Sequence, residues 1–184
     1  LPDGKMLVVG RHPTDGKAWN VIRMNPNGTL DSGFGSGGIR TTTFAGTQEI
    51  HPQRIAVSGS GDILVVGSIV GSANFLLARY TATGQETLRI GPTAGFFATD
   101  VIFDVSGTGR FIIAGTLMPG DIAARRFNAD GTVDTSYGNA GTASFPVSGI
   151  DDSGRQMVQQ ADGKVVVVGS GPNGDFGVVR FNNN

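Results

Sequence analysis

The sequence predicts an all-β fold, a β-propeller-like array of four-stranded antiparallel blades, with about three and a half blades in this chain. Two observations predict it. Short apolar runs that end in glycine recur four times, and an arginine follows each glycine at a nearly constant distance. The remaining β-branched and aromatic runs are short and bounded by Gly, Asp, Asn and Pro, and no stretch shows helical periodicity. Four short strands in each repeat of about 50 residues are typical of propeller blades.

The two landmarks keep their register along the whole chain. The glycine-terminated runs are Lys5–Gly10, Ile63–Gly67, Phe111–Gly115 and Lys164–Gly169, with glycines 57, 48 and 54 residues apart. The arginines follow these glycines by 13, 12, 11 and 11 residues, and they are Arg23, Arg79, Arg126 and Arg180. A β-sandwich or a barrel, the rival folds, would not explain this interval.

Each blade is expected to contain four strands. The first is predicted at residues 54–57, 100–105 and 156–160, and a tight turn such as Asp162-Gly163 joins it to the glycine-terminated second strand. The third strand carries the arginine, and the fourth is predicted at 39–44, 87–90 and 142–145. Both faces of the second strand are apolar, as expected for a strand buried between neighbouring sheets. The chain begins in a second strand and ends after a third, which gives fourteen strands.

The repeats divide a single domain, residues 1–184, into units of approximately 1–52, 53–98, 99–152 and 153–184. The N-terminus, Leu1-Pro2-Asp3-Gly4, has neither a signal peptide nor an initiator methionine, so we expect a piece of a longer chain. Four blades are the small extreme of closed propellers. Open edges would pair with another copy, as a homo-oligomer, or with neighbouring repeats of the same precursor.

The composition excludes several classes of function. Net charge is −1 and Lys and Arg are not gathered into runs, so we expect no nucleic-acid partner. No apolar run approaches the ~20 residues that cross a bilayer, so we expect no membrane insertion. Cysteine is absent, which removes disulfides, thiol catalysis and Cys-based zinc sites. No nucleophile elbow or metal-ligand pair of histidines occurs, so no catalytic residue is nominated and we do not expect an enzyme.

One long motif resembles a known repeat family. It consists of Pro2 to Gly10 followed by Arg23-Met24-Asn25-Pro26-Asn27-Gly28-Thr29-Leu30-Asp31-Ser32-Gly33-Phe34-Gly35, and residues 126–138 and 161–169 repeat its parts. This motif resembles the delta-60 repeat. Residues 79–87 keep the arginine and the glycine but lack the Asp-Ser-Gly-Phe-Gly segment. The resemblance implies a secreted or cell-surface bacterial protein of uncertain function, and it brings no catalytic residues.

The turn after each third strand is a candidate calcium site. Its oxygen-bearing side chains are Asn25, Asn27 and Asp31 in the first unit and Asn128, Asp130 and Asp134 in the third. Hard cations bind several oxygen ligands from a short segment, although the EF-hand spacing and its distal Glu are missing. The alternative is that these side chains cap a turn in which glycine is left-handed. Residues 81–84 keep the glycine without the carboxylates, which favours the turn. No other cofactor is expected.

The registered arginines have two interpretations. They could line a channel and bind an anionic ligand. Alternatively, each could pair with a carboxylate or with backbone carbonyls and so tie one strand to its neighbour, which is the commoner use of such a residue.

In an up-and-down meander, the variable connections gather on one side of the blades, the side that we call the variable loop face. Loops on a rigid scaffold commonly carry binding sites. The candidate ligand-binding residues there are Arg11, His12, Trp19, Glu49, His51, Phe97, Asp151 and Asp152. They suit a glycan or a peptide, although Trp19 could instead pack on its own blade. We therefore expect a non-catalytic module for adhesion or ligand recognition, and the alternative is a structural unit that assembles into a ring or fibre through exposed blade edges.

Overall fold

The computed structural model describes residues 1–147, 152–171 and 174–183. In these ranges the chain forms fourteen strands. They are β1 (Met6–Arg11), β2 (Ala18–Met24), β3 (Ile39–Thr43), β4 (Ile50–Val57), β5 (Ile63–Ile69), β6 (Asn74–Tyr80), β7 (Glu86–Ala94), β8 (Phe96–Phe103), β9 (Phe111–Leu117), β10 (Asp121–Phe127), β11 (Thr142–Phe145), β12 (Ser153–Gln159), β13 (Val165–Ser170) and β14 (Phe176–Phe181).

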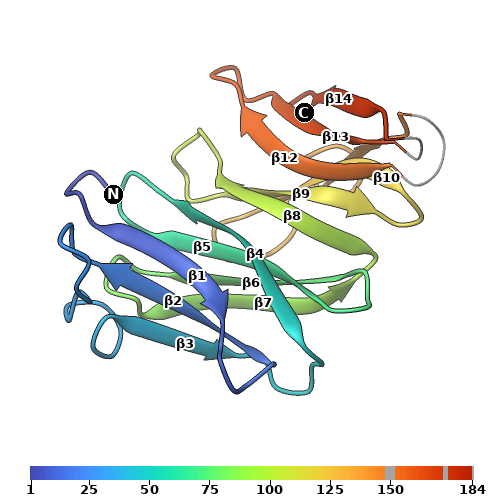
Figure 1. Ribbon diagram of the computed structural model, residues 1–184. Coiled ribbons are helices and arrows are strands. Elements are labelled where there is room, and N and C mark those ends of the chain that lie inside the picture. Colours follow the sequence, from blue (N-terminus) through green and yellow to red (C-terminus); the bar gives the residue numbers. More distant parts are fainter. Residues whose placement is uncertain (148–151, 172–173, 184) are drawn as a thin grey trace.

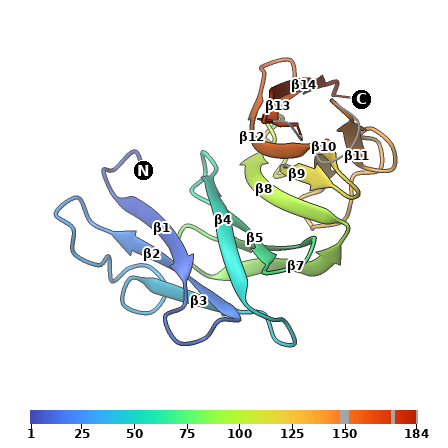
Figure 2. The same cartoon turned by 45° about the vertical axis from the view of Figure 1, so that its right-hand side comes forward.

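The strands form four antiparallel meanders, which we call blades 1 to 4 (Figure 1). Blade 1 has the order β1-β2-β3, blade 2 β4-β5-β6-β7, blade 3 β8-β9-β10-β11 and blade 4 β12-β13-β14. Figure 2 shows the blades side by side along an arc that does not close. The structure therefore confirms the propeller-like all-β fold, and the strand order agrees with the one expected from the sequence.

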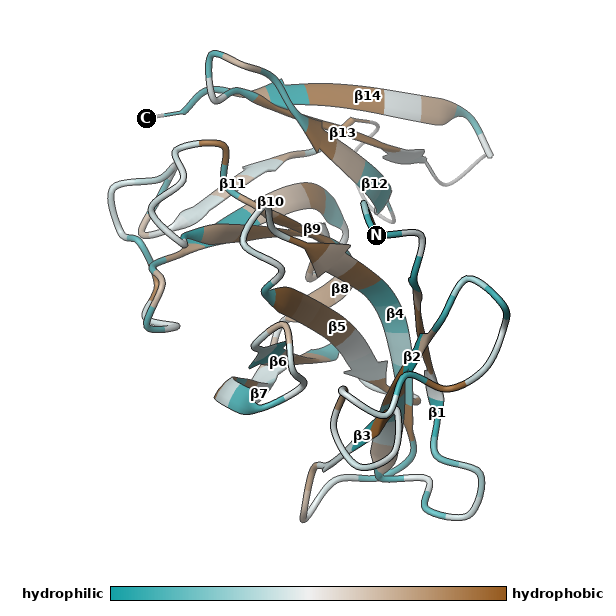
Figure 3. Ribbon diagram, turned by 90° about the vertical axis from the view of Figure 1, so that its left-hand side faces the viewer, coloured by the Kyte–Doolittle hydropathy of each residue, from teal (hydrophilic) through white to brown (hydrophobic). Residues whose placement is uncertain are grey.

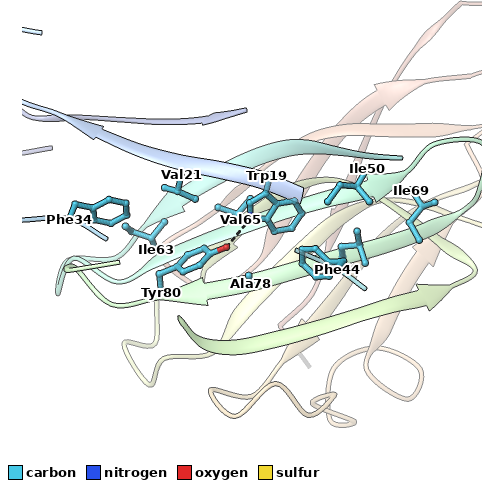
Figure 4. Packing of buried hydrophobic residues seen from close by; sticks show 11 residues of the cluster. Trp19, Val21, Phe34, Phe44, Ile50, Ile63, Val65, Ile69, Ala78 and Tyr80 are labelled. Carbon is cyan, nitrogen blue, oxygen red and sulfur yellow. Dashed lines mark hydrogen bonds between the residues drawn. The ribbon is translucent and has the colours of Figure 1, made fainter. Parts of the chain in front are cut away.

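Hydrophobic cores lie between successive blades. The second strands are apolar on both faces, as the brown colour of β5 in Figure 3 shows, and every residue of β5 is buried. Between blades 1 and 2, Trp19 packs on Phe44 with 4.6 Å between ring centroids. The Trp19 Nε1 donates a 2.8 Å hydrogen bond to the Tyr80 hydroxyl (Figure 4). Similar clusters join blades 2 and 3 and blades 3 and 4, so each blade is stabilised mainly by its neighbours.

Each registered glycine lies inside its second strand, one or two residues before the end, and it is needed where a bulged first strand runs beside it. The first strands β4, β8 and β12 each contain an irregular register at this level. A Cβ on Gly115 would lie 2.0 Å from the Phe97 carbonyl oxygen, and one on Gly169 would lie 2.1 Å from the Ser153 oxygen. Strand β1 has no first strand beside it in the described residues, and a Cβ on Gly10 would have no atom within 4 Å.

Several strands are longer than the sequence predicts, most of all β4 and β7. Strand β4 begins at Ile50 rather than residue 54, because the bulge absorbs the irregularity around Pro52. Strand β7 extends to Ala94 through Gly91-Pro92, because it is the outermost strand of blade 2 and a missing amide is tolerated at a sheet edge. In the described ranges, no helix has the length and apolar character to cross a membrane.

Candidate functional site

Three of the four registered arginines, Arg23, Arg79 and Arg126, bind the following blade. Arg23 donates from Nε to Asp31 at 2.6 Å, and its guanidinium lies over the Phe34 ring, 4.9 Å from the centroid. From Nη1 it donates to the carbonyl of Ala82, in the turn after the third strand of blade 2. The guanidinium therefore joins its own turn to the equivalent turn of the next blade.

Arg126 and Arg79 repeat this contact with different acids. Arg126 pairs with Asp134 at 2.8 Å and donates to the Asn183 carbonyl of blade 4 at 3.3 Å. Arg79 donates to the Ala129 carbonyl of blade 3 at 3.3 Å, but its carboxylate partner is Asp62, at 2.6 Å. Blade 2 lacks the motif aspartate, and an acid from its first turn replaces it. These contacts match the local pairing interpretation rather than a ring of free guanidinium groups.

The candidate calcium residues lie in the turns that these arginines hold. The Asn27 carboxamide oxygen accepts from the Thr29 amide at 3.1 Å, and Asp130 accepts from the Thr132 amide at 2.9 Å. Asp31 contacts the Lys5 ammonium at 2.9 Å as well as Arg23. The Asn25 side chain donates to the Thr29 hydroxyl and to the Leu30 carbonyl. In the third unit, the Asn128 side chain donates to the Thr132 hydroxyl. Asp134 pairs there with Arg126.

The geometry of both turns therefore favours the capping interpretation. Each motif aspartate faces two cationic side chains, an arrangement that competes with a bound cation. The hydrogen bond from Lys5 is the main reason why the pKa of the Asp31 carboxyl is lowered to about 2. Within the described residues, no three His, Cys, Asp or Glu side chains are grouped closely enough to hold a metal ion.

The candidate ligand-binding residues separate into two groups and a buried residue. Glu49 joins Arg11 and His51 between blades 1 and 2, through an ion pair and a 3.4 Å contact. His12, nearby in sequence, accepts the Asp15 amide at its Nδ1, 3.1 Å away. Trp19 is fully buried, so its indole does not reach the variable loop face.

Phe97 and Asp152 form the second group, at a hollow of about 380 Å³ on the variable loop face where blades 2, 3 and 4 meet. Asp152 is buried and its carboxylate accepts the Val147 amide at 2.6 Å. Asp151 lies outside the described residues. The full lining consists of Ser72, Ala73, Phe97, Thr116, Met118, Pro119, Gly120, Asp152 and Ser153.

The lining of this hollow is mainly apolar with polar groups at its margin. Met118 is half-exposed, and Phe97 is partly buried beside it. The hydroxyls come from three blades: Ser72 lies in the β5–β6 connection of blade 2, Thr116 in β9 of blade 3 and Ser153 at the start of β12 of blade 4. Sequence reasoning nominated Phe97 and Asp152 but missed Met118 and the hydroxyls, because only the stacking of three blades brings these loops together.

Three segments match the family model described as "Domain of unknown function (DUF5122) beta-propeller", namely residues 1–34, 107–137 and 160–184. The chain therefore resembles the DUF5122 β-propeller family over these three segments. This finding confirms the resemblance to the delta-60 repeat. The DUF5122 match omits residues 35–106, which include the divergent second unit. Asp62 now explains how that unit keeps the arginine contact without the motif aspartate.

A solved structure is similar to this chain in overall fold. It is the crystal structure of a protein from Lactobacillus plantarum, with a TM-score of 0.56 and 14% sequence identity. The alignment covers 98% of this chain and 55% of that protein, so the chain spans about half of that protein's length. At this identity the likeness concerns the fold alone. No curated protein matches the sequence.

Asp100 is a buried charge that the sequence reasoning did not single out. It is 1% exposed, and it pairs with Arg54 of blade 2 at 3.1 Å. Its other oxygen accepts the Met157 amide of blade 4 at 2.8 Å. The carboxylate therefore connects the first strands of three consecutive blades. The available signal in the sequence was a single acid directly before the apolar run 101–103.

Proposed function

We propose that this chain is a non-catalytic recognition module of an exported bacterial protein, and that its ligand, a glycan or a short peptide, binds at the hollow on the variable loop face. The observation that carries the proposal is the position of that hollow. It lies where three blades meet, and two connections that differ between the repeats, β5–β6 and β9–β10, contribute Ser72, Ala73, Met118, Pro119 and Gly120 to its lining. Binding sites commonly lie on variable loops of a rigid scaffold.

The chemistry of the lining supports this class of ligand. Phe97 and Met118 offer apolar surface to the flat face of a sugar or to an apolar side chain. Three hydroxyl groups at the margin can donate to and accept from sugar hydroxyls or peptide groups. The opposite side of the blades is less suited to ligands, because its turns are held by the paired arginines.

The experiment is a binding screen followed by calorimetry. Immobilised glycans and short peptides identify a ligand, and titration then compares the wild-type chain with Phe97→Ala. Removing the ring from the hollow should weaken binding at least tenfold, which corresponds to about 1.4 kcal/mol. Phe145→Ala is the matched control, because Phe145 is exposed on β11 and does not line the hollow.

Two results would contradict the proposal. One is the absence of binding to either panel at millimolar ligand. The other is an equal loss of affinity in Phe97→Ala and Phe145→Ala, which would place the ligand elsewhere.

A further inference from the structure

We propose that the hollow on the variable loop face binds a basic peptide by taking up one of its lysine or arginine side chains. The aliphatic stem of that side chain lies on Phe97 and Met118, and the charged head faces Asp152. This inference rests on the proposed function, because it names the ligand class of the same hollow. It favours a basic peptide over a glycan or an acidic ligand.

The apolar part of the lining suits an aliphatic chain. Phe97 is partly buried and Met118 is 51% exposed, and both line the hollow beside Ala73 and Pro119. Lysine and arginine side chains combine an apolar methylene stem with a charged head. The stem can bury its surface against this lining while the head stays at the polar margin. A neutral apolar side chain gains the same contact, so the polar groups of the lining decide the selectivity.

The charge of the lining favours a cation. Asp152 is the only ionisable side chain among the nine lining residues that the structure describes. It is 1% exposed, and its carboxylate accepts the Val147 amide at 2.6 Å. A carboxylate accepts hydrogen bonds from several donors at once, and salt screens a buried charge less than an exposed one. The hollow therefore attracts an ammonium or guanidinium group and repels a carboxylate or a phosphate.

The hydroxyl groups of the lining offer acceptors rather than donors. The Ser72 hydroxyl donates to the Ile69 carbonyl at 3.3 Å, and the Thr116 hydroxyl donates to the Ser153 hydroxyl at 3.4 Å. A hydroxyl carries a single proton, so the oxygens of Ser72 and Thr116 serve a ligand as acceptors. Ammonium and guanidinium groups have donors and no acceptor, and they match this lining.

The backbone amides beside these hydroxyls are also engaged. Met118 donates to the Gly95 carbonyl at 3.0 Å, and the Asp152 amide donates to the Gly120 carbonyl at 2.8 Å. Pro119 has no amide hydrogen. Each hydroxyl of a sugar is an acceptor as well as a donor, so a sugar needs protein donors that these groups do not offer. The balance of donors and acceptors therefore favours the cationic side chain over a glycan.

The connections around the hollow carry the same sign of charge. The sequence has no Lys, Arg or His in the connections within and between blades 2 to 4, at residues 70–73, 95, 118–120, 146–152 and 171–175. Their charged residues are the acids Asp151, Asp152 and Asp175. A surface with charges of one sign raises the local concentration of a ligand of the opposite sign. The surroundings of the hollow therefore also favour a basic peptide.

A panel of capped pentapeptides tests the selectivity. The peptides share glycine and serine at the outer positions and differ at the central residue, which is lysine, arginine, acetyl-lysine, norleucine or glutamate. Chemical-shift titration of the ¹⁵N-labelled chain gives each dissociation constant. The lysine and arginine peptides should bind about tenfold more tightly than the acetyl-lysine and norleucine peptides, because only they carry the positive charge. The glutamate peptide should not bind.

Asp152→Asn removes the charge but keeps a side-chain oxygen that can accept the Val147 amide. It should reduce the preference for the lysine peptide over the norleucine peptide about tenfold. Asp130→Asn is the matched control, because Asp130 is exposed in a turn on the opposite side of the blades and its replacement changes the net charge equally. This control should keep the wild-type preference.

Salt dependence tests the same charge in the unaltered chain, whether or not Asp152→Asn folds. Raising the ionic strength from about 0.01 M to about 1 M shortens the Debye length from about 30 Å to about 3 Å. Binding of the lysine peptide should weaken, and binding of the norleucine peptide should not. Equal salt responses of the two peptides would contradict the proposed charge contact.

Phe97→Ala separates this inference from the proposed function. It should weaken the lysine and norleucine peptides by the same factor, because both lay an apolar chain on the ring. Equal binding of the lysine, norleucine and glutamate peptides, lost in Phe97→Ala, would overturn the cationic ligand and leave the hollow as a binding site. A glycan that binds at the hollow when the lysine peptide does not would overturn it as well. Absence of binding to every peptide and glycan would overturn both proposals.

Discussion

Adding one methyl group at Gly115 should destabilise the chain far more than adding it at Gly10, although both glycines end the same repeated motif. The Gly115 Cβ would lie 2.0 Å from the Phe97 carbonyl oxygen, where ordinary contact begins at 3.4 Å. Strands β8 and β9 must then separate by more than 1 Å. Overpacking costs about 1–3 kcal/mol, and each lost hydrogen bond adds about 1 kcal/mol. We therefore expect Gly115→Ala to lower the free energy of unfolding by about 3 kcal/mol.

Gly10→Ala is the matched control, because nothing lies within 4 Å of the added methyl group. Its effect should stay within about 0.5 kcal/mol, as for most surface substitutions. Urea unfolding followed by far-UV circular dichroism measures both variants, since the signal reports all four blades. Equal stabilities of the two variants would refute the argument that the bulged first strand dictates the glycine.

Further predictions concern the buried hydroxyls and the acidic turn. Tyr80→Phe removes the acceptor of the Trp19 Nε1 and should cost about 1–3 kcal/mol in urea unfolding. Tyr137→Phe should lower the free energy of unfolding by less than about 0.5 kcal/mol, because the buried Tyr137 hydroxyl has no hydrogen-bond partner in the described residues. The Asp31 pKa is lowered from 3.8 to about 2, chiefly by Lys5, so its ionised form stabilises the fold above pH 3.8 and this contribution is lost as the pH falls towards 2. Asp31→Asn should therefore make the free energy of unfolding fall less steeply between pH 3.8 and about pH 2. The same pH dependence in Asp31→Asn and wild type would contradict this role.

The architecture could be predicted from the sequence because its landmarks are local. The glycine in each second strand and the arginine in each third strand fix the strand order. In the structure, a close first strand explains Gly115 and Gly169, and hydrogen bonds to the next blade explain Arg23 and Arg126. Strand ends were harder to predict, because a proline in the sequence indicates the end of a strand. In the structure a bulge accommodates Pro52 in β4, and the edge position of β7 accommodates Pro92.

The site was less predictable, since it depends on contacts between blades. The sequence does not show that Trp19 turns inward to meet Tyr80, 61 residues away, rather than outward to a ligand. Nor does it show that Asp62 replaces the missing motif aspartate beside Arg79, because the two acids occupy different turns. Met118 was not nominated for the hollow, because its connection, β9–β10, differs in sequence from the equivalent connections of the other repeats.

The methionine methyl groups give the most direct test of recognition at the variable loop face. The chain has four methionines, and only Met118 lines the hollow, whereas Met6, Met24 and Met157 lie on other parts of the blades. In a ¹³C-methyl-methionine NMR titration with the ligand found in the screen, the Met118 resonance should shift and the other three should not. A ligand that shifts Met6, Met24 or Met157 and leaves Met118 unchanged would contradict the proposed site.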